Sequence, residues 1–223
     1  MYLLIIGAPR SGTTLFASMI SAHNEVAMLI EDRFFAVKKL TGKKILANKL
    51  CIPHQTELVK RANYFSRIAK KIGLLKNYTT SSYNINDYIN LPDSKIFAII
   101  RNGHDVVSSI KKRGGKEEKS AIYRWQRAME IIYQLKIQNA DKVALISYEE
   151  LVKRPEEILR QLSLLLNIEF QPQMLEGYKY NFLYPGENKI DSSKAVKENL
   201  SSDSYKFSEK SLDQYTYLKK YCI

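Results

Sequence analysis

Short runs of apolar residues recur along the chain between polar, turn-forming segments. Residues 2–6, 25–30, 95–100 and 142–146 have the length and composition of strands that are buried on both faces. In the longest helix-like segment, residues 118–139, apolar side chains recur on one face: Ile122, Trp125, Met129, Ile132 and Leu135. Buried strands that alternate with helices predict an α/β fold in three layers, with a central, mainly parallel sheet flanked by helices.

The same patterns predict the remaining helices, at residues 12–22, 84–91, 104–113, 155–167 and 208–220. A Lys-rich stretch, residues 34–75, also has a mostly helical pattern. The chain has 223 residues, no internal repeat and no long linker. We therefore expect one domain over residues 1–223, large enough for a full hydrophobic core.

The first predicted strand leads directly into a loop bounded by two glycines. The loop and the start of the next helix read Gly7, Ala8, Pro9, Arg10, Ser11, Gly12, Thr13 and Thr14. Backbone N–H groups and the helix dipole favour an anion at such a turn. The spacing fits the P-loop pattern G-x-x-x-x-G-K-[ST], except that Thr13 stands where the lysine is expected. Arg10 is the cation within the loop, and its guanidinium can bind a phosphate or sulfate with two hydrogen bonds.

The missing lysine changes the expected chemistry. A P-loop NTPase also holds Mg²⁺ with an Asp at the end of a second buried strand. Here the run 95–100 ends at Arg101 and the run 142–146 ends at Ser147. The sequence therefore predicts an anion site without a metal ion. A P-loop nucleotide kinase or other phosphotransferase stays open as the alternative enzyme class.

Two motifs give the chain a family resemblance. The stretch GAPRSGTTLF resembles the 5′-phosphosulfate-binding loop of sulfotransferases that use 3′-phosphoadenosine 5′-phosphosulfate (PAPS), a superfamily with a P-loop-like fold. The segment from Arg101 to Ser109 resembles the 3′-phosphate-binding motif of that family, R-[ND]-P-x-D-x-x-x-S, with Gly103 in place of the proline. The resemblance implies that Arg101 and Ser109 bind the 3′-phosphate and that Arg113 adds a further cation.

Further matches resemble the branch that includes tyrosylprotein and many bacterial sulfotransferases. Ala22 to Val26, followed by Glu31-Asp32-Arg33, resembles the stretch A-H-P-x-V…E-x-R of that branch, in which the Glu activates the acceptor. A lysine of a D-K or N-K pair matches Lys76, here preceded by Leu75. The block Y-E-D-L-x-x-x-P, whose Tyr lies by the nucleotide, matches the segment that begins at Tyr148. The C-terminal loop that closes over PAPS matches segments containing Ser192 and Lys206.

The resemblance implies metal-independent, in-line transfer of a sulfuryl group from PAPS to a hydroxyl of a glycan, a tyrosyl side chain or a small metabolite. Cofactor binding falls to Arg10, Ser11, Gly12, Thr13, Thr14, Arg101, Ser109, Arg113, Tyr148 and Lys206. Lys76 and Ser192 are expected to stabilise charge on the bridging oxygen, and Glu31 to take the proton of the acceptor hydroxyl. His54 is the rival base, and a surface ion pair with Arg33 is the structural alternative for Glu31.

The net charge and composition limit the classes of molecule that the chain is expected to bind. The chain has 35 Lys and Arg against 23 Asp and Glu, a formal net charge of +12, which would steer a polyanionic donor to the cleft. No nucleic-acid-binding motif accompanies the charge, so no nucleic-acid partner is expected. A basic nucleotide-binding protein without turnover remains a third option.

The remaining expectations concern location and assembly. Cys51 and Cys222 lack metal-ligand spacing and are expected to be free thiols in a reducing compartment. No apolar stretch reaches the roughly 20 residues of a membrane span. The first strand begins at Met1 to Leu3, which leaves no room for a signal peptide. We expect a cytoplasmic protein without a membrane span, and a homodimer is a candidate assembly.

Overall fold

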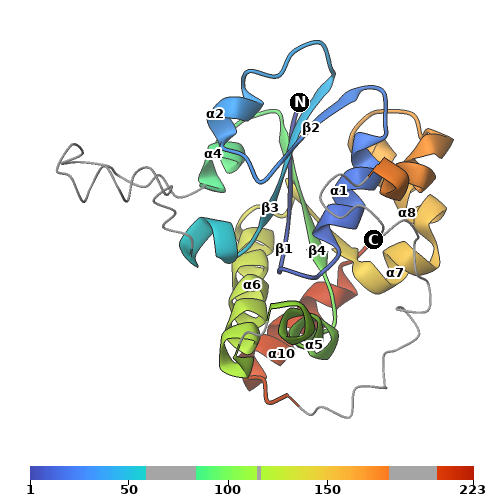
Figure 1. Cartoon of the computed structure of the whole chain (residues 1–223). Coiled ribbons are helices and arrows are strands. Elements are labelled where there is room, and N and C mark those ends of the chain that lie inside the picture. The colour runs from blue at the N-terminus through green and yellow to red at the C-terminus, as the bar shows by residue number, and fades with distance from the viewer. Residues whose placement is uncertain (59–83, 115–116, 181–204) are drawn as a thin grey trace, which may run out of the picture.

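The computed structural model describes residues 1–58, 84–114, 117–180 and 205–223 (Figure 1). These residues build a five-stranded sheet in which every neighbouring pair of strands is parallel. The strand order is β2-β3-β1-β4-β5, with the bounds β1 (Tyr2–Gly7), β2 (Val26–Ile30), β3 (Ile45–Cys51), β4 (Ser94–Ile100) and β5 (Val143–Ser147). The predicted α/β fold with a parallel central sheet is confirmed.

Helices cover both faces of the sheet. The α-helices are α1 (Thr13–Ser21), α2 (Phe34–Val37), α4 (Asn86–Ile89), α5 (Gly103–Gly114), α6 (Glu118–Gln138), α7 (Tyr148–Lys153), α8 (Pro155–Leu165) and α10 (Glu209–Lys220). A π-helical segment, η1 (His54–Leu58), follows β3, and a 3₁₀ segment, η2 (Pro172–Tyr180), follows α8. Figure 1 shows α1, α7 and α8 on one side of the sheet and α5, α6 and α10 on the other.

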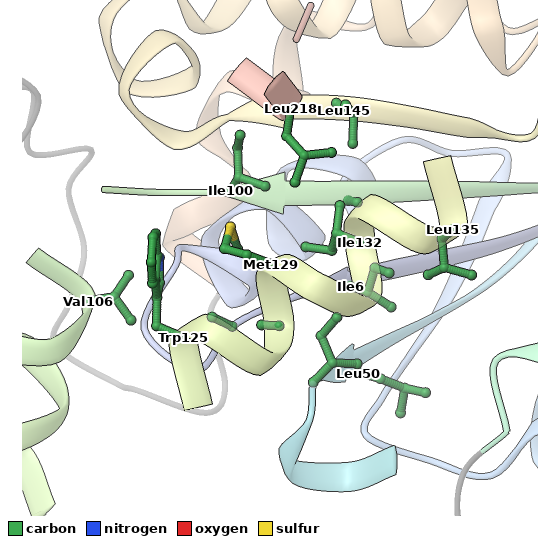
Figure 2. Packing of buried hydrophobic residues seen from close by; sticks show 14 of the residues in the cluster. Ile6, Leu50, Ile100, Val106, Trp125, Met129, Ile132, Leu135, Leu145 and Leu218 are labelled. Carbon is green, nitrogen blue, oxygen red and sulfur yellow. The ribbon is translucent and has the colours of Figure 1, made fainter. Parts of the chain in front are cut away.

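Alternate side chains of β1 enter two separate hydrophobic cores. Leu3 and Ile5 pack with α1, α7 and α8, whereas Leu4 and Ile6 pack with α5, α6 and α10. Figure 2 shows the second core, in which the apolar face of α6 lies against the strands, as its periodicity predicts. Trp125 is only 1% exposed and belongs to this core.

One prediction from the sequence is wrong. Residues 34–75 are expected to be mostly helical, but Ile45–Cys51 form β3, which lies between β2 and β1 in the sheet; the part of this prediction that covers residues 59–75 lies outside the described residues. The apolar pattern of this strand is interrupted by Asn48 and Lys49, which are 0% and 1% exposed. Two buried polar residues in the middle of a strand hide it from a search for apolar runs.

The topology predicts a crevice at the carboxyl ends of the strands. After β1 the chain passes through α1 to β2 on one side, and after β4 it passes through α5 and α6 to β5 on the other. Adjacent strands that leave in opposite directions open a crevice between their ends, where α/β sheets bind ligands. The glycine-bounded loop after β1 and Arg101 after β4 flank this point.

Candidate active site

The loop between β1 and α1 is closely packed at both glycines. A Cβ atom at Gly7 would lie 2.6 Å from both the Ile99 carbonyl oxygen and Ser11 Oγ. Gly12 has φ +91°, and a Cβ there would lie 2.3 Å from Cδ2 of Tyr148. The hydroxyl of Ser11 donates to the Ala8 carbonyl oxygen over 2.7 Å. Sterics and this hydrogen bond therefore fix the loop in one conformation.

Helix α1 begins directly at the end of this loop. Gly12 is its N-cap and makes no side-chain capping bond, and its first turn holds no acidic residue. The partial positive charge of this helix end is therefore not offset by a neighbouring carboxylate of the first turn. Such an end is suited to an anion.

Arg10 joins the two sequence motifs. Its backbone has φ +71°, and its Nε donates to Ser109 Oγ on α5 over 3.0 Å. In return, Nη1 of Arg101 donates to the carbonyl oxygen of Arg10 over 3.2 Å. Arg10, Arg101 and Ser109, which the resemblance assigns to one nucleotide, are thus neighbours at the crevice.

The guanidinium of Arg101 retains a free donor. It lies over the ring of Tyr148, 4.2 Å from the centroid, and its Nη2 is 3.6 Å from Asp105. Its Nε is buried and meets no hydrogen-bond acceptor in the part of the chain that the structure describes. A buried donor without an acceptor is costly unless a ligand satisfies it, so this geometry fits a bound phosphate.

Buried groups fix the turn that carries Arg101. Glu149 accepts from the Asn102 N–H over 2.9 Å and from Ser147 Oγ over 2.7 Å. Nε1 of Trp125 donates to the carbonyl oxygen of Arg101 over 3.0 Å. A Cβ at Gly103 would lie 2.9 Å from rings of Trp125 and Phe207. This packing explains why glycine replaces the proline of the family motif here.

A second group of polar side chains lies at the ends of β2 and β3. Nζ of Lys49 donates to Glu31 Oε1 over 2.7 Å and to Cys51 Sγ over 3.3 Å. Cys51 Sγ in turn lies 3.6 Å from Thr13 Oγ1 in the first turn of α1. The structure therefore places Glu31 beside the anion loop, with Lys49 as its ion-pair partner, whereas the sequence offered Arg33 for that pair.

The pKa of Glu31 is set by opposing effects. Partial burial pushes it upward, but the hydrogen bond and charge of Lys49, with hydrogen bonds from Cys51 and Gln55, hold the pKa below its ordinary value. The carboxylate is therefore ionised at neutral pH. Burial raises the pKa of the Cys51 thiol despite the nearby ammonium of Lys49, so this thiol is neutral.

The remaining predicted site residues lie at different distances from the loop, and two of them fall outside the described residues. Tyr148 is in contact with the loop, and Thr14 and Arg113 lie on α1 and α5. Lys206 is exposed and lines a hollow between α6 and α10, while its neighbours Tyr205 and Phe207 pack on His104. Lys76 and Ser192 lie outside the described residues, so their roles stay predictions.

Sequence reasoning missed the residues that β3 contributes. Lys49 and Cys51 contact the site through their side chains, and Gln55 accepts a hydrogen bond from the Cys51 N–H. One signal was present: Asn48-Lys49 is an N-K pair, the form that the family pattern has and that Leu75-Lys76 lacks. His54, the rival base, opens η1 immediately before Gln55 and stays a candidate.

Two features are absent from the described ranges. No three His, Cys, Asp or Glu side chains there come together as a metal site. No helix among those ranges is both long and apolar enough to span a membrane.

Comparisons with known proteins agree with this geometry. A family model described as the sulfotransferase family matches residues 88–172, which include the Arg101 turn and Tyr148. The chain is 27% identical over 194 residues to protein-tyrosine sulfotransferase 1 of Danio rerio, covering 78% of this chain and 55% of that protein. It is 25% identical over 200 residues to the protein-tyrosine sulfotransferase of Drosophila melanogaster, covering 80% and 40%. The chain thus spans about half the length of these relatives.

Solved structures share the fold. The sulfotransferase domain from the curacin biosynthetic pathway matches with a TM-score of 0.67 at 17% identity, covering 97% of this chain and 96% of that one. The sulfotransferase domain of the Synechococcus PCC 7002 olefin synthase matches with a TM-score of 0.64 at 15% identity, covering 98% and 94%. The resemblance to the sulfotransferase family, in the branch of the tyrosylprotein and bacterial enzymes, is confirmed.

Proposed function

We propose that the chain transfers a sulfuryl group from PAPS to an acceptor hydroxyl without a metal ion. One observation carries the proposal: Arg10 donates to Ser109 Oγ and Arg101 donates to the Arg10 carbonyl oxygen, which joins the two anion motifs. We further propose that residues 1–223 act as a single domain. A glycan, a tyrosyl side chain and a small hydroxylated metabolite remain candidate acceptors.

The residues on the loop side fit the donor. The N-terminus of α1, Arg10, the loop amides including that of Ser11, and the hydroxyls of Thr13 and Thr14 would hold the 5′-phosphosulfate. Arg101, whose buried Nε lacks an acceptor among the described atoms, would hold the 3′-phosphate with Ser109 and Arg113. When bound, PAPS supplies the sulfuryl group and a nucleotide that leaves with the electron pair of the broken S–O bond.

The residues at the ends of β2 and β3 would act on the acceptor. Glu31 accepts the proton of the acceptor hydroxyl as its oxygen forms the new bond to sulfur, a role worth about 10²–10⁴ in rate. Lys49 keeps this carboxylate ionised and brings a positive charge beside the reacting groups. Lys76 and Ser192 stay the predicted partners of the oxygen on the leaving nucleotide.

The alternatives have less support. A nucleotide kinase would need a P-loop lysine and a strand-end Asp, whereas Thr13 and Arg101 stand at those positions. A nucleotide-binding protein without turnover would not need an ionised carboxylate such as Glu31, paired with the buried Lys49, beside the anion loop.

A two-part experiment tests the proposal. Purified protein is first titrated with 3′-phosphoadenosine 5′-phosphate and with Mg·ATP while its Tm is recorded; the former should give the larger rise. Labelled PAPS is then supplied with panels of glycans, tyrosine peptides and small phenols, with and without EDTA. A larger shift from Mg·ATP, or label transfer that EDTA abolishes, would contradict the assignment.

A further inference from the structure

Asn48 is a buried polar residue that the proposed reaction does not use. It lies in the middle of β3 with an exposure of 0%, directly before Lys49. Successive residues of a strand point to opposite faces, so Asn48 points away from the face on which Lys49 meets Glu31. An unpaired amide would be costly there, which raises the question of what this side chain binds.

The amide of Asn48 is bonded to the backbone that follows Glu31. Its Nδ2 donates to the Asp32 carbonyl oxygen over 2.6 Å, and its Oδ1 accepts from the Asp32 N–H over 3.3 Å. Oδ1 also accepts from the N–H of Lys49 over 2.9 Å. One side chain therefore satisfies both backbone polar groups of Asp32 and ties them to β3.

Glu31 needs such support because its backbone is unusual. It has φ +58°, in the left-handed region that residues with a Cβ seldom adopt. Its N–H donates to the Lys49 carbonyl oxygen over 2.8 Å, and its carboxylate accepts from Lys49 Nζ. Two consecutive residues of β3 thus hold Glu31 at its amide, at its carboxylate and, through Asn48, at the next peptide.

We propose that Asn48 is a positioning residue that holds Glu31 in the orientation required for proton transfer. The inference rests on the proposed function of Glu31 as the base. The bonds from Asn48 to this segment are made to the backbone of Asp32, next to Glu31, so Asn48 acts through Glu31. Asparagine suits the role because binding both the N–H and the carbonyl oxygen of Asp32 requires an acceptor and a donor on one side chain. An aspartate of the same shape cannot donate to the Asp32 carbonyl oxygen.

The test compares Asn48→Asp with Ser94→Ala. Ser94 is also a buried polar residue of the sheet, and its Oγ is bonded to the carbonyl oxygens of Tyr88 and Leu91 at the opposite, amino end of β4. We expect Asn48→Asp to lower kcat by about 10- to 100-fold, because small misplacements of a reacting group are costly. The KM for PAPS should change less than about threefold, as expected for a group outside the donor site. Ser94→Ala should lower Tm and leave kcat near that of the unmodified protein.

A double variant separates this inference from the proposed function. If Asn48 acts through Glu31, then Asn48→Asp added to Glu31→Gln should lower kcat little further, because both changes disable one unit. Multiplicative losses, or a kcat loss matched by Ser94→Ala, would overturn the positioning role. Near-full activity of Glu31→Gln alone would instead overturn Glu31 as the base, whatever Asn48→Asp does.

Discussion

The proposed donor half of the site is built from short contiguous segments, whereas the proposed acceptor half depends on residues of neighbouring strands. On the donor side, the loop up to Gly12, the Arg101 turn and Tyr148 each follow directly after the end of a strand. On the acceptor side, Glu31 directly follows β2, while its partner Lys49 belongs to β3, 18 residues later. The first half is held by glycine turns and backbone bonds, and the second by an ion pair between the buried Lys49 and the exposed Glu31.

This difference predicts different responses to substitution. Donor contacts exist before and during the reaction, so their loss should mainly lower affinity. A base acts only as the bond forms, so its loss should mainly lower turnover. The substitutions below are ordered by the size of the expected effect.

Glu31→Gln should lower kcat by about 100-fold or more, since the amide keeps the shape but cannot accept the proton. Affinity for 3′-phosphoadenosine 5′-phosphate, measured by calorimetry, should be unchanged. Asp32→Asn is the matched control, because Asp32 is the adjacent exposed carboxylate and should tolerate the change. Near-full activity of Glu31→Gln on the native acceptor would transfer the role of base to His54.

Arg101→Ala should weaken binding of the same nucleotide by about 10- to 100-fold, the usual value of hydrogen bonds to a charged group. At saturating PAPS, kcat should fall much less. Arg113→Ala, at the exposed end of α5, should have a smaller effect on affinity. Lost turnover with unchanged affinity would show that Arg101 belongs with the acceptor half.

Gly12→Ala and Gly42→Ala separate backbone strain from crowding. Both glycines have positive φ, but a Cβ at Gly42 meets no atom within 4 Å, whereas one at Gly12 meets the ring of Tyr148. Gly42→Ala should lower the free energy of unfolding by about 1–2 kcal/mol. Gly12→Ala should cost about 1–3 kcal/mol more from overpacking and should also weaken nucleotide binding. Equal losses in chemical denaturation would contradict the close contact at Gly12.

Lys49→Met should raise the pKa of Glu31, because burial of the carboxylate stays and its cation is removed. NMR titration of the Glu31 carboxyl carbon measures this shift. The lowered pKa in the unmodified protein means that the pair stabilises the fold above the ordinary carboxyl pKa and loses this effect as pH falls. The stability difference between the two proteins should therefore shrink in acid. Identical titration midpoints would contradict the pair; Lys142→Met, a lysine bonded to carbonyl oxygens, is the control.

Much of the fold and of the donor half could be predicted because their signals are local. Apolar runs located β1, β2, β4 and β5, and fixed spacings located Arg10, Arg101 and Ser109. β3 could not be found in this way, since Asn48 and Lys49 make a buried strand look polar. Their burial is tolerated because the Asp32 carbonyl oxygen and the Glu31 carboxylate accept their hydrogen bonds. These partners come from the segment after β2, so the sequence of β3 alone does not reveal them.

The hydrogen bond from Trp125 to the Arg101 carbonyl has a practical consequence. Trp125 is the single tryptophan of the chain, so its fluorescence is that of one indole. That indole is buried among Phe207 and Tyr215 and is bonded to the backbone of the proposed phosphate-binding arginine. Its emission is therefore expected to be blue-shifted and to change when a nucleotide phosphate binds to Arg101. The protein thus has a built-in optical probe of nucleotide occupancy.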